Sequence, residues 1–272
     1  MDRKFTLHGS TIGWRAKWPA MGEIAARAGY QGVVLPREAW QAPAPAPDGI
    51  AVTAMAVPVE IRRDEETYRS GLPDLERAVA FGASTGCRVA VVGLPPSSEA
   101  PKAEQKEIYR RRLEPCLDAF ARHGVRLAVE AISPLHLRRA RPYEFIWRMD
   151  EMFEFVRSLS AEAGLVADCW HWHHAGETAD DLLALGRDAF LDVHISDAPA
   201  IPPEDIRDME RVLPGEGVID FDTFFGALDR MGYDGAISVE VFGSRLAEFD
   251  PAEAARTALE AARLRVPARL PI

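Results

Sequence analysis

Short apolar runs recur along the chain, and segments with helical periodicity separate them. Near-continuous apolar runs of this kind are typical of parallel strands that are buried on both faces. The runs lie at residues 5–12, 32–35, 50–59, 88–93, 126–130, 164–168, 189–194 and 236–240. These eight runs match the number of strands that closes a parallel α/β barrel.

Amphipathic segments that predict helices fill most of the gaps, at residues 21–28, 72–85, 104–123, 143–160, 180–186, 221–231 and 251–264. Gly232 follows one of them as a stop signal for the helix. The second gap is irregular, because residues 42–49 read APAPAPDG and alternating prolines forbid a regular helix. We therefore expect a shortened second helix.

This alternation predicts an α/β fold, a single (β/α)8 TIM barrel over residues 1–272, because no stretch resembles a linker between domains. An open, doubly wound sheet would show the same alternation, but no GxGxxG motif follows the first strand. In a barrel the catalytic residues collect at the carboxyl ends of the strands. We therefore expect the catalytic residues of this chain at the carboxyl ends of its strands.

Composition narrows the class of partner and the compartment. The chain of 272 residues has a formal net charge of −10 and a pI near 5.3. Nucleic-acid binding normally rests on a surplus of Lys and Arg, so a small neutral or polar substrate fits better. The three cysteines are too scattered for a disulfide framework, and no apolar run approaches the roughly 18 residues of a membrane span. We expect a soluble protein of the reducing cytoplasm with no membrane partner.

The last four predicted strands each end in a residue type that ligates metals: Glu130, Asp168, His194 and Glu240. Barrel strands converge on one mouth, so three carboxylates and one imidazole would meet there with coordination positions left for substrate oxygens. One such carboxylate alone is more often a helix cap or an ion-pair partner. Four in consecutive strands predict an open, catalytic metal site. Its oxygen-rich ligand set suits Mn²⁺ first, with Mg²⁺, Co²⁺ or Zn²⁺ as alternatives.

Three stretches carry a resemblance to a known family: DCWH at residues 168–171, HISD at residues 194–197, and RVLPGEGVIDF followed by GYDGAISVEVF. The chain resembles the sugar phosphate isomerase/epimerase group of xylose isomerase-like TIM barrels. The resemblance implies that Glu130, Asp168, His194 and Glu240 are metal ligands and that Glu130 and Glu240 are the catalytic pair. It also implies a homo-oligomer.

The resemblance further implies substrate-binding residues. His171 matches a histidine that hydrogen-bonds a substrate oxygen, with an orienting role behind the ligands as the alternative. Arg211 matches a substrate-binding arginine, and Glu216 lies in PGEG, where the glycines also suit a purely structural turn. His136 stands where ketose epimerases carry a substrate-binding glutamate. This departure makes dehydration or isomerisation as admissible as 3-epimerisation.

Two residues near the first strand are candidates by position. His8 ends the apolar core of that strand and Trp14 follows it, so both are expected to wall the mouth, where aromatic rings stack on sugars. Both are also ordinary core residue types.

The predicted function is a divalent-metal-dependent isomerase, epimerase or related dehydratase. It would act on a keto-sugar or polyol by removing a proton next to a carbonyl, through a metal-stabilised enediolate. One alternative is a metal-dependent endonuclease of the related three-zinc barrels, which need histidines that strands two to four lack here. The other is a non-catalytic barrel that binds sugar or serves as a partner subunit.

Overall fold

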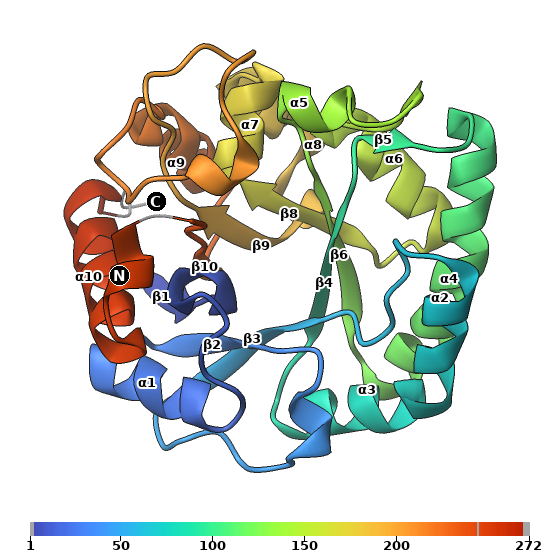
Figure 1. Cartoon of the computed structure of the whole chain (residues 1–272), viewed down its shortest axis with the longest axis horizontal. Coiled ribbons are helices and arrows are strands. Elements are labelled where there is room, and N and C mark those ends of the chain that lie inside the picture. The colour runs from blue at the N-terminus through green and yellow to red at the C-terminus, as the bar shows by residue number, and fades with distance from the viewer. Residues whose placement is uncertain (1–2, 244, 269–272) are drawn as a thin grey trace.

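Eight parallel strands close into a barrel in the computed structural model, which describes residues 3–243 and 245–268 (Figure 1). The strands are β1 (Lys4–Leu7), β2 (Gly32–Leu35), β3 (Ala51–Ala56), β4 (Val89–Leu94), β6 (Arg126–Ala131), β8 (Gly164–Asp168), β9 (Phe190–Ile195) and β10 (Ala236–Val239). β1 pairs with both β2 and β10, which closes the sheet and leaves no edge in it. The predicted TIM barrel is confirmed.

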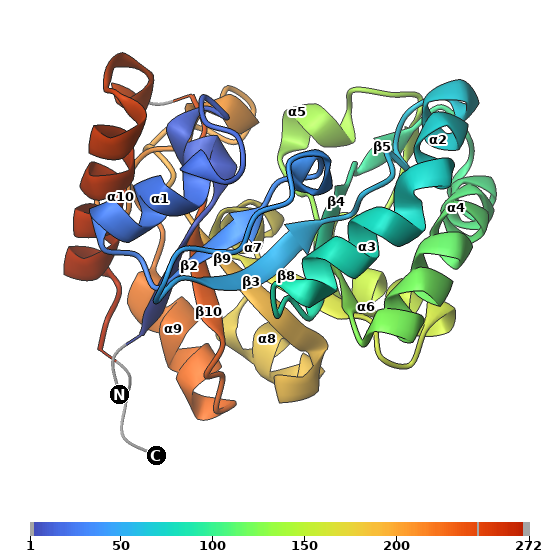
Figure 2. The same ribbon diagram turned by 90° about the horizontal axis from the view of Figure 1, so that it is seen from below.

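Helices surround the strands, as Figures 1 and 2 show. They are α1 (Ala20–Ala28), α3 (Leu75–Ser84), α4 (Lys102–His123), α6 (Met149–Leu159), α8 (Ala179–Leu185), α9 (Phe221–Arg230) and α10 (Pro251–Arg265). α9 shows why they form: the Asp220 side chain accepts a hydrogen bond from Thr223 N, and Phe221, Phe224 and Leu228 form a buried stripe against the barrel. No helix in the described ranges is long and apolar enough to cross a membrane.

The second helix of the barrel is reduced to one 3-10 turn, η2 (Ala39–Gln41), before the proline-rich stretch. The shortened helix is therefore confirmed. The helix predicted over residues 143–160 is longer than the one observed. Tyr143–Glu144 form β7, which pairs with β5 (Ser97–Ser98), and α6 begins only at Met149. A short helix, α2 (Glu65–Gly71), begins after the N-cap Asp64 and was not predicted.

The first strand is also shorter than its apolar run. β1 ends at Leu7, and Gly9–Ile12 form the 3-10 turn η1, which closes at Gly13 with a φ of 61°. The His8 imidazole accepts a hydrogen bond from Ser10 N at the start of this turn. The turn directs the following residues over the mouth of the barrel.

The barrel interior is divided into an apolar and a polar part. Side chains alternate between faces along a strand, so residues between those that pack on the helices point inward. Five inward residues on β2, β3, β4, β6 and β8 form a small apolar cluster: Val34, Ala54, Val91, Ala128 and Val166. On β1, β9 and β10 the corresponding buried residues are the polar Thr6, Asp192 and Ser238. The polar side leads to His194 and Glu240, whereas Glu130 and Asp168 lie at the ends of β6 and β8, which contribute to the apolar cluster.

A buried glutamate links the segment after α7 (Cys169–Ala175) to the start of α6. Glu177 Oε1 accepts a hydrogen bond from Met149 N, so the carboxylate caps a helix from a distant part of the chain. Its other oxygen, Oε2, is buried and has no hydrogen-bond partner in the described chain. Burial raises the pKa of Glu177 from 4.5 to about 7.

This raised pKa makes stability depend on pH. The carboxyl ionises at lower pH in the unfolded chain than in the folded protein, so its contribution to the free energy of unfolding is largest below about pH 4.5 and is lost as the pH rises to about 7. At about 1.4 kcal/mol per pKa unit the loss is about 3 kcal/mol. We expect Glu177→Gln to be more stable than wild type at pH 8 and similar at pH 4.5 in urea unfolding. The exposed Glu104→Gln serves as the control, and equal pH dependence of Glu177→Gln and wild type would contradict the prediction.

Candidate metal centre

The four predicted metal ligands meet at the carboxyl ends of β6, β8, β9 and β10. One ligand atom from each of Glu130, Asp168, His194 and Glu240 lies within 4.8 Å of the others. The strand register brings them together: Asp168 is the pairing partner of His194, and Glu240 N donates to Ile195 O at 2.9 Å. The predicted convergence of the last four strands is thus present in the structure.

The site fits a divalent cation on its own chemistry. Oε1 of Glu130 is buried and has no hydrogen-bond partner among the described residues, although Nδ1 of His194 lies 3.3 Å away. Asp168 is fully buried and Glu240 is 5% exposed, so three carboxylates are crowded where water screens them poorly. Gly93 pairs with Glu130 and leaves it room, because a Cβ there would lie 2.9 Å from Glu130 Oε2. Three oxygens and one nitrogen form a set that Mn²⁺ or Zn²⁺ accepts.

His194 is oriented by a carboxylate that the sequence analysis missed. Its Nδ1 lies 3.3 Å from Glu130 Oε1 and from Glu240 Oε2, while its Nε2 lies 3.3 Å from Asp192 Oδ2. A proton on Nε2 that is held by Asp192 leaves the Nδ1 lone pair free for a metal. Burial alone would lower the pKa of His194, but Glu240, Asp192 and Glu130 raise it well above its usual value. Asp192 stands two residues before His194 on β9, a spacing that places both on the same face of a strand.

Arg211 is a buried cation in direct contact with the ligands. Its Nη1 donates to Asp168 Oδ2 at 2.8 Å and to Glu240 Oε2 at 3.1 Å, and its Nη2 donates to Asp208 Oδ1 at 3.0 Å. The guanidinium also lies over the rings of Trp170 and Phe242, with 5.2 and 4.5 Å to the ring centroids. Arg211 is therefore a buried and paired side chain, not a solvated surface arginine.

His171 lies on α7, and its ring faces the predicted ligands. Its Nδ1 accepts a hydrogen bond from Ser133 N at 3.2 Å, so Nε2 carries the proton of the neutral ring. Nε2 lies 3.7 Å from Glu130 Oε2 and 3.8 Å from Asp168 Oδ2. Burial would lower the pKa of His171, but Glu130 and Asp168 outweigh it and raise the pKa.

His8 and Trp14 lie on the β1 side of the site. His8 Nδ1 lies 2.7 Å from Ser10 Oγ and 3.2 Å from Glu240 Oε1, and burial lowers the pKa of His8. Trp14 packs edge-on against His8 at 5.3 Å and is 48% exposed, so its ring borders the mouth rather than filling the core. A side chain at Gly9 would clash with this ring.

Glu216 and His136 do not line the cavity at the metal centre. Glu216 is exposed in the turn 213–217, and its Oε2 accepts a hydrogen bond from Leu213 N at 3.3 Å. His136 lies behind Asp208. Its Nε2 accepts a hydrogen bond from Asp208 N at 3.5 Å, and the Asp208 side chain accepts one from Arg211. These positions give no support to the substrate contacts that we expected for the two residues, and those contacts remain predictions.

The turn that contains Glu216 is tied to the HISD motif. Asp197 is buried and accepts four backbone hydrogen bonds, from Gly215 N and Gly217 N at Oδ2 and from Ala198 N and Ile219 N at Oδ1. A Cβ on Gly217 would collide with Ala198 O, so glycine is required there. PGEG is thus a turn held by Asp197, which follows the predicted ligand His194 by three residues.

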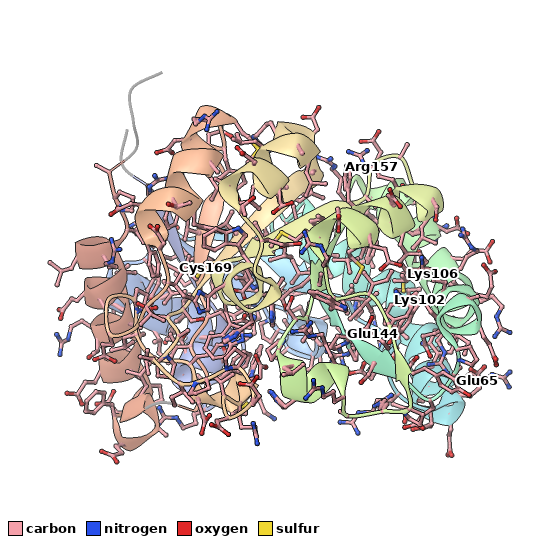
Figure 3. All side chains as sticks on the ribbon, turned by 90° about the horizontal axis from the view of Figure 1, so that it is seen from above. Glu65, Lys102, Lys106, Glu144, Arg157 and Cys169 are labelled. Atoms are coloured by element: carbon pink, nitrogen blue, oxygen red, sulfur yellow. The ribbon has the colours of Figure 1, made fainter. Side chains whose placement is uncertain are left out.

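A cavity of about 530 Å³ opens over these residues. Its wall includes seven of the predicted site residues: His8, Trp14, Glu130, His171, His194, Arg211 and Glu240. Val91 and Val166 from the apolar cluster also line it, and so do Arg37 and Arg62 on the β2 and β3 side, which the sequence analysis missed. Cys169, the residue after Asp168, is labelled in Figure 3 and lies near the middle of the molecule. The labelled Lys102 and Lys106 lie on α4, at the periphery.

The chain belongs to the xylose isomerase-like TIM barrel family, whose model matches residues 22–265. It is similar to the inosose isomerase of Bacillus velezensis, with 27% identity over 201 residues that cover 73% of this chain and 69% of that protein. A xylose isomerase domain protein from Alicyclobacillus acidocaldarius superposes with a TM-score of 0.84 at 25% identity, over 97% of this chain and 98% of the other. A crystal structure of the IOLI protein with a bound zinc atom superposes with a TM-score of 0.78 at 21% identity, over 99% and 100%.

Removing one ligand charge tests the metal centre. We expect Asp168→Asn to lose most of its bound metal on dialysis against a chelator, because one of three carboxylate ligands becomes a weak neutral donor. Metal content is measured by inorganic mass spectrometry with Glu177→Gln, another buried carboxylate, as the control. Retention of the wild-type metal content in Asp168→Asn would show that the assigned site is wrong.

Asp192→Asn tests the orientation of His194. The amide cannot hold the Nε2 proton as the carboxylate does, so the dissociation constant for Mn²⁺ should rise about 10- to 100-fold, as for other partners of metal-bound histidines. Free Mn²⁺ is measured by electron paramagnetic resonance. An unchanged dissociation constant would mean that Asp192 only packs against the ring.

Proposed function

We propose that this protein is a divalent-metal-dependent isomerase or epimerase that acts on a keto-sugar or polyol. The observation that carries the proposal is the pair of carboxylates, the partly buried Glu130 and the buried Glu240, which reach one ligand cluster from β6 and from the end of β10 and border one open cavity. Membership of the family and the similarity to an inosose isomerase support the same reaction class.

Glu130, Asp168, His194 and Glu240 would hold the metal. When bound, a divalent ion polarises the substrate carbonyl and stabilises the negative charge that follows proton removal. We propose Mn²⁺ first, from the oxygen-rich set, with Zn²⁺ as the alternative that the zinc-bound IOLI structure supports.

The protein groups that move the proton are Glu130 and Glu240. Burial would raise the pKa of Glu240, but the neighbouring His8 and His194, together with Arg211, hold it below its usual value. The pKa of Glu130 is likewise low, because His171 and His194 overcome the effect of burial. Both side chains are therefore ionised at neutral pH, and either oxygen that is turned to the cavity can accept a proton from carbon.

The remaining wall residues orient the substrate. His171 presents the proton on Nε2 beside Glu130, which suits a substrate hydroxyl or carbonyl oxygen. Arg211 balances the charge of Asp168 and Glu240 and supplies a fixed guanidinium beside the reacting carbon. Trp14 and His8 form an aromatic edge on the β1 side, where a sugar ring can stack.

Glu240→Gln separates proton transfer from binding. The amide preserves the shape of the side chain but cannot take up a proton, so the rate should fall roughly 10²- to 10⁴-fold, the usual contribution of general acid-base catalysis. The measurement is the incorporation of solvent deuterium next to the carbonyl, followed by NMR with inososes and ketoses. Metal content is checked in parallel, and unchanged exchange in the metal-loaded variant would transfer the role to Glu130 or His171.

A further inference from the structure

Two arginines line the side of the cavity that lies opposite the predicted metal ligands, and both are paired with one glutamate. Arg37 follows β2, and Glu60 and Arg62 follow β3. Nη1 of Arg37 donates to Glu60 Oε2 at 2.8 Å, and Arg62 donates through Nε to Oε1 at 2.8 Å and through Nη2 to Oε2 at 2.9 Å. We call these three residues the Arg37–Glu60–Arg62 cluster.

The cluster has hydrogen-bond donors left over. Nε of Arg37 donates to Val57 O, but among the described residues no partner engages Nη2 of Arg37 or Nη1 of Arg62. Both side chains line the cavity that contains Glu130, and the charge of Glu130 is near enough to influence Arg62. The side chains are 33% and 36% exposed, so both guanidiniums are accessible from the cavity.

The backbone that carries Arg62 is fixed from behind. Nη1 of Arg112, on α4, donates to Ile61 O at 2.9 Å and to Arg63 O at 2.6 Å. These two carbonyls flank Arg62, so the guanidinium is presented by a held segment rather than by a free loop. An adjoining cavity of about 660 Å³ shares Arg62 and is lined by both signs of charge, with Arg63, Arg112 and Arg141 beside Glu60, Asp64 and Glu99.

Charge counting distinguishes this cluster from a structural ion pair. One arginine is sufficient to neutralise Glu60, and an ion pair that is partly exposed to water stabilises a fold only slightly. The two arginines hold the pKa of Glu60 at about 2 against the opposing effect of burial, so its carboxylate is always ionised and one positive charge is left over. Of the acidic residues on the cavity wall, Glu130 and Glu240 belong to the candidate metal centre, Asp208 is bound to Arg211, and Glu38 is exposed at the rim.

We propose that the Arg37–Glu60–Arg62 cluster binds an anionic group, a carboxylate or a phosphate, at the end of the substrate opposite the metal. The inference rests on the proposed function and narrows it to sugar acids or sugar phosphates. The free N–H groups of two guanidiniums suit the paired oxygens of such groups. A cavity of about 530 Å³ lies within the usual range of small-molecule sites, about 300–1,000 Å³, and spans from the ligands to the cluster.

Matched substrates test the inference. Deuterium exchange is measured on Mn²⁺-loaded protein with fructose against fructose 6-phosphate and with dihydroxyacetone against hydroxypyruvate, which separates phosphate from carboxylate. We expect KM for the charged member of at least one pair to be tenfold or more below that of its neutral partner. Arg62→Gln and Arg37→Gln should each raise KM for the charged member about tenfold without changing KM for its neutral partner, as expected for the loss of a charge-assisted hydrogen bond. Arg256→Gln, on α10 away from the cavity, is the control.

Binding of inorganic phosphate to the metal-free protein, measured by calorimetry, gives a readout that needs no turnover. Wild type and Arg256→Gln should bind it with the same affinity, and Arg62→Gln should bind it at least tenfold more weakly. Exchange on neutral sugars without any preference for the charged partners would overturn the anionic substrate and leave the proposed function intact. Phosphate binding that depends on Arg62, with no exchange on any compound, would keep the anion site and count against the isomerase. No phosphate binding to wild type would overturn the anion site.

Discussion

The mutual repulsion of three carboxylates, two buried and one partly buried, is the constraint on which the rest of the site depends. Glu130, Asp168 and Glu240 meet where water is largely excluded, and such a group is stable only with compensating positive charge. Arg211 supplies one fixed charge, and the raised pKa of His194 shows how strongly the cluster attracts another. A divalent cation satisfies the same demand while also activating a substrate carbonyl, so the electrostatic need of the fold and the proposed chemistry have the same solution.

The barrel has a polar and an apolar part, so the opposite sides of the cavity differ in polarity. The β9 and β10 side carries polar residues up to the ligands, whereas Val91 and Val166 form an apolar floor toward β4 and β8. The Arg37–Glu60–Arg62 cluster lies on the other side of this floor, next to the short turn η2 that stands in the place of the second barrel helix. A substrate that enters the cavity meets the metal ligands on one side, an apolar floor, and an excess of positive charge on the other side, although the chain as a whole is acidic.

Residues behind the ligands hold this arrangement in place. Asp192 fixes the ring of His194, Ser133 fixes that of His171, and Asp197 clamps the turn that precedes α9. The contacts of Asp192 and Ser133 are buried and those of Asp197 with the turn are partly buried, and each joins positions that carry a different part of the site. The motifs HISD and PGEG, which read as separate features in the sequence, are therefore one hydrogen-bonded unit.

The sequence by itself determined the barrel and the four residues of the candidate metal centre, because both follow from local rules. Runs of buried strand residues recur with helical segments between them, and a residue that ends a parallel strand must lie at the mouth, where Glu130, Asp168, His194 and Glu240 come together. Asp192 was within reach of the same reasoning through its spacing of two from His194. Only the tertiary structure decided which side chains turn toward the cavity. It brought Arg37 and Arg62 together on Glu60 and left Glu216 and His136 outside the wall, because contacts between segments distant in sequence depend on loop paths that no local pattern encodes.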